Sequence, residues 1–160
     1  MAIRCAAKAL IVDGSRILLN RCRRQDGSIY YDLPGGGQHP FESMEQAVRR
    51  EVLEETGLSV RVLRFAAMAE EIYTNENLRQ RYPDYCHRVM HIFTAEPDGA
   101  ATVSPSEKDW GMEESEWISL DDVEDLPQLR PMALQPRLKE ILSSGIPVWL
   151  GTEYVDWDHE

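Results

Sequence analysis

A glycine-rich turn that leads into a helix constrains this chain more than any other feature. Residues 34–37 read Pro-Gly-Gly-Gly, and proline followed by glycines interrupts regular structure. Residues 42–56 contain neither glycine nor proline, which predicts a helix. Ser43 is placed to cap its first turn together with Gln46, and Gly57 stands where a helix end favours glycine. The segment therefore predicts a tight loop followed directly by a capped helix.

The sequence on both sides of this unit predicts a sheet. Asp13-Gly14 is a dipeptide typical of β-hairpins, and a strand-like run lies on each side of it. A second helix is expected within residues 131–142, where Pro136 would shift its start or kink it. The runs expected to form strands are residues 3–12, 16–21, 29–33, 58–72, 87–95 and 117–119. Several strands with two helices predict an α/β fold built on a mixed sheet.

The length of 160 residues fits one domain with a single core. We expect this domain to occupy residues 1–145. Residues 146–160 are expected to be a C-terminal extension, which forms either an edge strand or a tail. The same segment is a place where two copies can pair, so a monomer and a homodimer both remain open.

The formal net charge of −11 limits the partners of the chain. A strongly acidic protein repels polyanions over long range, so we expect no nucleic-acid partner. A small phosphorylated ligand is still compatible with this charge, because a bound divalent cation reverses the local field.

Three other features of the sequence indicate the cellular compartment of the protein. No apolar run approaches the length that spans a bilayer, so no membrane partner is expected. The first residues do not have the pattern of a signal peptide. Three cysteines, an odd number without a CxxC pair, predict reduced thiols rather than a disulfide framework. We therefore expect a cytoplasmic protein.

Three glutamates of the predicted helix share one side of it. Glu51, Glu54 and Glu55 are spaced i, i+3 and i+4, which brings their carboxylates together. Like charges at these spacings cost roughly 0.2–0.5 kcal/mol each, so Arg50, solvent or a divalent metal must offset the repulsion. Carboxylate oxygens are ligands that Mg²⁺ prefers. Glycines before the helix let backbone groups approach a metal or a phosphate closely.

These residues resemble the signature of the Nudix hydrolases, G-x5-E-x7-R-E-U-x-E-E-x-G-U, in which U is a bulky aliphatic residue. The matching residues are Gly36, Glu42, Arg50, Glu51, Val52, Glu54, Glu55, Gly57 and Leu58. The similarity includes Tyr-Asp-Leu-Pro-Gly-Gly at residues 31–36 and extends loosely to residues 116–120. The resemblance implies a Nudix-type α/β/α sandwich, with a mixed sheet between helices.

The resemblance also implies a role for each signature residue. Glu51, Glu54 and Glu55 are expected to bind Mg²⁺, which Mn²⁺ can replace, together with the carbonyl group of Gly35. The implied reaction is attack of a metal-activated water on phosphorus in a diphosphate. Glu51, Glu54 and Arg50 form the expected catalytic set, in which Arg50 orients the carboxylates. Gly36 and Glu42 are expected to support the site.

The residue that takes the proton of the water differs among Nudix hydrolases. Glu51 is one candidate here, and a carboxylate of a later loop, Glu113 or Glu114, is the other. Arg21, Arg23 and Tyr31 are possible substrate contacts, because arginine suits phosphates and tyrosine can stack on a base. A solvated strand end for the arginines and a packing role for the tyrosine are the alternatives.

The expected substrate is a small nucleotide-type molecule, a nucleoside diphosphate linked to another group. A nucleoside triphosphate or a dinucleoside polyphosphate is preferred, and an ADP-ribose-type substrate stays open. Two other functions remain as alternatives. One is a nucleotide-sensing module without catalysis, and the other is an isoprenoid diphosphate isomerase, which needs a cysteine such as Cys22 or Cys86. The complete set of glutamates favours hydrolysis over both.

Overall fold

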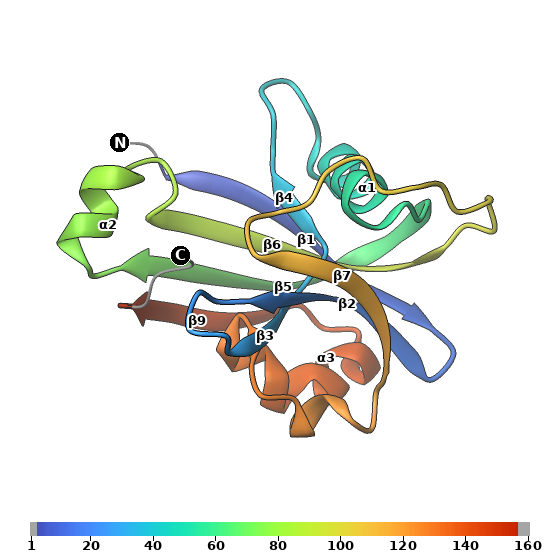
Figure 1. Ribbon diagram of the computed structural model, residues 1–160. Coiled ribbons are helices and arrows are strands. Elements are labelled where there is room, and N and C mark those ends of the chain that lie inside the picture. The colour runs from blue at the N-terminus through green and yellow to red at the C-terminus, as the bar shows by residue number, and fades with distance from the viewer. Residues whose placement is uncertain (1–2, 157–160) are drawn as a thin grey trace.

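The hairpin expected at Asp13-Gly14 forms the middle of a nine-stranded mixed sheet in the computed structural model, which describes residues 3–156 (Figure 1). The strands are β1 (Arg4–Asp13), β2 (Arg16–Arg23), β3 (Ile29–Asp32), β4 (Gly35–Gly37), β5 (Val60–Tyr73), β6 (His87–Pro97), β7 (Met112–Ser119), β8 (Leu129–Arg130) and β9 (Val148–Val155). They run in the order β8-β3-β2-β1-β6-β5-β9, with β4 paired to β1 and β7 paired to β2.

Helices cover both faces of this sheet (Figure 1). Helix α1 (Met44–Thr56) packs on one face, where Val48 and Val52 join Ile11 in a buried cluster. On the other face, a 3₁₀ segment (Met132–Arg137) leads into α3 (Leu138–Ser144), and Leu10 belongs to the core that they cover. Because alternate residues of β1 enter opposite cores, the central strand is buried on both sides. The expected α/β/α sandwich is confirmed.

Local signals place α1 as predicted. The Ser43 side chain accepts a hydrogen bond from the amide of Gln46, and the Gln46 side chain accepts one from the amide of Ser43. Gly57 ends the helix in the left-handed conformation, with φ of 71°. The helix begins at Met44 rather than at residue 42, because Ser43 is its cap.

Other elements differ from the sequence expectation. Strand β7 begins at Met112, five residues before the predicted start at Trp117. A short helix, α2 (Glu76–Arg81), lies in a segment expected to be a loop, where Asn75 caps it. A short 3₁₀ turn (Val123–Asp125) follows β7.

Strand β9 pairs in parallel with β5 at the edge of the sheet. Residues 157–160 of the expected C-terminal extension lie outside the described residues. No helix among residues 3–156 is long and apolar enough to cross a membrane.

Candidate active site

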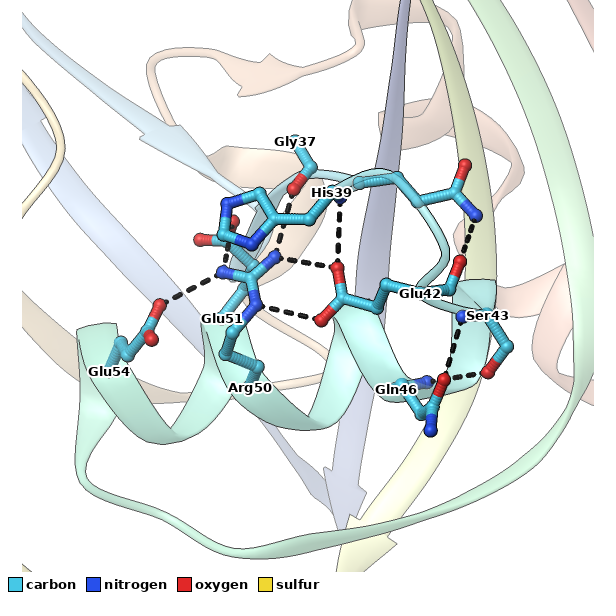
Figure 2. Close-up of polar contacts among 9 residues, drawn as sticks. Gly37, His39, Glu42, Ser43, Gln46, Arg50, Glu51 and Glu54 are labelled. Atoms are coloured by element: carbon cyan, nitrogen blue, oxygen red, sulfur yellow. Dashed lines mark hydrogen bonds and ion pairs between the residues drawn. The ribbon is translucent and has the colours of Figure 1, made fainter.

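Arg50 is the centre of a polar cluster at the junction of β4 and α1 (Figure 2). Its Nε and Nη2 atoms donate to the two oxygens of Glu42 at 2.8 and 2.9 Å. Its Nη1 atom donates to Glu51 Oε1 at 2.8 Å and to Glu54 Oε2 at 3.0 Å. The carbonyl oxygen of Gly37 accepts from Nη2 at 3.0 Å. One guanidinium therefore ties together the end of β4, the following loop and α1.

Arg50 also affects the protonation of Glu42. Its hydrogen bonds lower the pKa of Glu42 to about 2, so that carboxylate is ionised at neutral pH. In turn, the hydrogen bonds that Arg50 donates to Glu42 raise the pKa of Arg50. Arg50 thus offsets the repulsion expected among the glutamates of α1, the first of the three candidates considered for that role.

Gly36 leaves room for one of these carboxylates. A Cβ atom at this position would lie 2.5 Å from Glu51 Oε2 and 2.6 Å from Glu51 Cδ. The Glu51 carboxylate therefore rests directly against the backbone of β4. Gly35 is needed for another reason, because its φ is 124° and a Cβ there would overlap the backbone of β1.

Glu55 lies apart from the other two glutamates and is buried, with 2% of its surface exposed. Its Oε2 atom accepts from the Asn20 side chain at 2.8 Å and from the Gly35 amide at 2.9 Å. Its Oε1 atom is buried and has no hydrogen-bond partner. Burial raises the pKa of Glu55 to about 8, against the opposing charge of Lys8 and with a contribution from Asp109.

Glu51, Glu54 and Glu55 share one property that suits a metal. In each carboxylate, one oxygen accepts hydrogen bonds from the protein and the other accepts none from residues 3–156. Three free carboxylate oxygens beside a glycine strand form a donor set that fits a hard divalent cation. No three acidic, histidine or cysteine side chains in the described part of the chain surround one point as ligands. At least one of these glutamates must therefore rotate to share an ion with the others.

The other predicted site residues lie on β2, β3 and β7. Arg21 and Arg23 both bind the carboxylate of Glu113. Glu114 lies opposite Arg21 in the β2–β7 register, and no described hydrogen bond or ion pair joins it to α1. Tyr31 is buried, with 8% exposed, in the core that α3 covers. The two arginines are thus occupied by a carboxylate of the neighbouring strand.

Three residues beside Glu55 were missed by sequence reasoning: Lys8, Asn20 and Asp109. The oxygen of the Asn20 side chain accepts from Ser115 Oγ at 2.8 Å, which links β7 to the site. The ammonium group of Lys8 donates to the carbonyl of Leu33 at 3.0 Å. Burial alone would lower the pKa of Lys8, but nearby carboxylates outweigh burial and raise it. The signal was present, since both Lys8 and Asn20 interrupt apolar strands.

Comparison with known proteins identifies relatives of this chain. Residues 3–140 match the model of the NUDIX domain. An NAD-capped RNA hydrolase NudC from Deinococcus radiodurans is 36% identical over 118 residues, which cover 73% of this chain and 35% of that protein. The NudC of Chromobacterium violaceum is 31% identical over 133 residues, covering 83% of this chain and 43% of that protein. The chain thus spans less than half of the length of these curated relatives.

The fold has solved counterparts as well. The structure of a MutT protein from Bacillus halodurans superposes with a TM-score of 0.69 at 24% identity, covering 99% of this chain and 94% of that one. That likeness shows the shared architecture. Together with the match over residues 3–140, it shows that the chain belongs to the Nudix family of hydrolases, which act on pyrophosphate bonds.

Proposed function

We propose that this chain is a Mg²⁺-dependent pyrophosphohydrolase that cleaves the diphosphate of a nucleoside diphosphate linked to another group. The observation that carries the proposal is the set of half-satisfied carboxylates on α1. Glu51, Glu54 and Glu55 each have one oxygen fixed by protein donors and one oxygen free of them. A purely structural ion-pair network has no need for a buried oxygen without a partner, such as Glu55 Oε1.

Glu51, Glu54 and Glu55 would hold Mg²⁺, or Mn²⁺ in its place. The cation would supply an activated water and neutralise charge on the phosphate oxygens. The carbonyl of Gly35 remains a proposed fourth contact, and in the structure the amide of the same residue donates a hydrogen bond to Glu55. Arg50 fixes the direction of the Glu51 and Glu54 carboxylates before any ligand arrives, which lowers the reorganisation needed for reaction.

We assign the proton of the attacking water to Glu51. Its carboxylate lies against Gly36 with Oε2 free to accept a proton. Glu113 is a weaker base, because its hydrogen bond from Arg23 and the charge of Arg21 hold its pKa below the usual range. Glu114 makes no hydrogen bond with α1 among the residues described, so Glu51 is the better placed carboxylate.

A nucleoside triphosphate or a dinucleoside polyphosphate is the preferred substrate, and an ADP-ribose-type molecule is also open. A dinucleotide of the NAD type is a second candidate, because the curated relatives are named NAD-capped RNA hydrolases. All these molecules carry a diphosphate attached to a nucleoside. The proposed reaction is therefore the same for each of them, and the group beyond the diphosphate differs.

An assay over a substrate panel tests the proposal. Purified protein is incubated with ATP, diadenosine tetraphosphate, ADP-ribose and NADH, each with Mg²⁺ and with EDTA, and products are separated by chromatography. We expect Mg²⁺-dependent formation of two phosphorylated products, or of a nucleoside monophosphate and pyrophosphate from ATP. Folded protein that cleaves none of these compounds would contradict the proposal.

The same assay separates the alternatives. Tight nucleotide binding without Mg²⁺-dependent product would indicate a sensing module. The isomerase alternative requires a reactive thiol, and Cys22 and Cys86 are both buried. Burial raises the pKa of Cys22 to about 12, which leaves that thiol protonated and unreactive at neutral pH.

A further inference from the structure

The side chain of Arg4 lies between an aromatic ring and the glycine strand of the site. Its guanidinium carbon is 4.5 Å from the centre of the Tyr85 ring, which is a cation–π contact. It also lies against Gly37, where a Cβ atom would overlap three atoms of the guanidinium. The Arg4 guanidinium is therefore held close to both the Tyr85 ring and the backbone of β4.

The N–H donors of Arg4 have no acceptor among the described residues. Arg4 forms no hydrogen bond or ion pair with any residue between 3 and 156. The other guanidinium that contacts Gly37 belongs to Arg50, which is fully engaged with Glu42, Glu51 and Glu54. Arg4 and Arg50 thus both contact Gly37 of the candidate site. Arg50 binds carboxylates, whereas Arg4 forms no ion pair with a described residue.

A second arginine lies next to Arg4. Arg4 stands beside Arg88 in the parallel register of β1 and β6. Arg88 is paired with Glu71, which also pairs with the buried Arg130. The carboxylate that pairs with Arg88 is thus already shared with another arginine, and no described ion pair reaches Arg4. A phosphate is an anion of the kind that such an arginine binds.

We propose that Arg4 binds a phosphoryl group of the substrate, and that Tyr85 is a positioning residue that holds its guanidinium in place. The inference rests on the proposed function and names one contact of that substrate. A guanidinium without a described acceptor presents parallel N–H donors, the geometry that binds two oxygens of one phosphate. Gly37 faces Arg4 and the adjacent Gly36 faces Glu51, so the guanidinium and the carboxylate flank the same short strand from its two sides.

Calorimetric binding of inorganic pyrophosphate in EDTA tests this contact without catalysis. Because Arg4→Gln removes a charged hydrogen-bonded contact, we expect it to weaken binding about 10-fold or more. Arg4→Lys should recover part of the loss, since it keeps the charge and loses the fork. Tyr85→Ala should weaken binding several-fold, whereas Tyr85→Phe, which keeps the ring, should not.

The matched control is Arg16→Gln. Arg16 also lies over an aromatic ring, that of Trp117 at 5.3 Å, at the turn of the β1–β2 hairpin. Wild-type affinity in Arg4→Gln, an equal loss in Arg16→Gln, or no measurable pyrophosphate binding by the wild type would each overturn the inference. Circular dichroism melting confirms that each variant is folded.

Kinetics provide a second and separate readout. With a cleaved substrate from the panel, Arg4→Gln should raise KM about 10-fold with a smaller change in kcat. An unchanged KM would overturn the inference even if hydrolysis is confirmed. If the wild type cleaves nothing, the proposed function fails, and the pyrophosphate titration still decides the role of Arg4.

Discussion

At the scale of single residues, three glutamates of one helix differ in their surroundings and hence in their chemistry. Glu51 and Glu54 are ion-paired to Arg50, which is itself part-exposed. Glu55 is buried between Asn20 and the amide of Gly35. Residues of one type on one helix therefore have different partners, and burial raises the pKa of Glu55.

Replacement of Glu54 by Gln should separate metal binding from folding. The only described polar partner of the Glu54 side chain is Arg50, and such pairs contribute about 1 kcal/mol or less. The melting temperature in EDTA should therefore change little. Turnover should fall at least about 100-fold, because a proposed metal ligand is lost. Glu45→Gln, on the exposed first turn of the same helix, is the control and should keep its activity. A large loss of stability in Glu54→Gln would mean that this glutamate is structural.

The raised pKa of Glu55 predicts how stability depends on pH. Between the ordinary value of 4.5 and about 8, the folded protein holds a proton on Glu55 that the unfolded chain has lost. The free energy of unfolding should therefore fall as pH rises through this range. Since one pKa unit corresponds to roughly 1.4 kcal/mol, we expect a decline of at least about 1 kcal/mol in EDTA.

Urea denaturation of Glu55→Gln from pH 5 to pH 8.5 checks this result. The amide is neutral at every pH, so the variant should lack the part of the decline that Glu55 causes. Parallel curves for the variant and the wild type would show that Glu55 has an ordinary pKa in the folded protein.

At the scale of elements, the site depends on the fit between β4 and α1. The glycines of β4 let the strand pair with β1 while the Glu51 carboxylate and the Arg4 guanidinium lie against it. The helix is fixed from its other end, because the amides of Ser106 and Glu107 donate to the carbonyl of Glu54. The strand and the helix are thus held in place by different contacts. Because neither can move away from the other, the strand needs residues without side chains where they meet.

Gly36→Ala should damage the site more than the fold. The added Cβ would lie 2.5 Å from Glu51 Oε2 and displace that carboxylate. We expect turnover to fall about 10-fold or more, with a stability loss of roughly 1–2 kcal/mol, the usual cost of overpacking. Gly99→Ala is the control for turnover: its φ of 84° strains any added side chain, but a Cβ there meets no atom within 4 Å, so stability should fall while kinetics stay at the wild-type level. Mg²⁺ titrations of turnover measure the effect, and wild-type kinetics in Gly36→Ala would contradict the described contact.

The sequence predicted elements whose signals are local. Helix α1 could be placed because Ser43, Gln46 and Gly57 act within one turn of its ends. The start of β7 could not, because its acidic residues disfavour a strand until Arg21 and Arg23 on β2 neutralise Glu113. Pairings of this kind depend on the register between distant strands.

The same distinction applies to the candidate site. The spacing of Glu51, Glu54 and Glu55 placed them on one helix, but it could not show that Glu55 is buried. That burial depends on Asn20 of β2 and on Gly35 of β4, which the fold brings to the helix. Helical periodicity reports the direction of a side chain and not what covers it.

At the scale of the whole molecule, a buried ion cluster joins strands that are distant in sequence. Glu71 on β5 is fully buried and binds Arg88 on β6 and Arg130 on β8. The charges of Arg88 and Arg130 outweigh burial and lower the pKa of Glu71 to about 2. Its contribution to stability is therefore present above its ordinary pKa and is lost as pH falls towards 2.

Glu71→Gln should destabilise the whole fold. The change removes the buried carboxylate that pairs with Arg88 and Arg130, and breaking a buried ion pair in this way costs roughly 3–5 kcal/mol. The control is Glu70→Gln on the same strand, because Glu70 binds His87 and Thr152 at the part-exposed surface and should matter little. Urea denaturation at pH 7 measures both variants. Equal midpoints for the two would show that the buried cluster does not stabilise the sheet.

The central claim is that the glutamates of α1 hold a divalent metal, and Mn²⁺ binding followed by electron paramagnetic resonance tests it most directly. The concentration of free Mn²⁺ is measured as protein is added, and Mg²⁺ is then added to compete for the same site. We expect bound Mn²⁺ in the wild type and in Glu45→Gln, and binding at least about 10-fold weaker in Glu51→Gln and Glu54→Gln. Equal Mn²⁺ binding in all four proteins, or none in the wild type, would contradict the account.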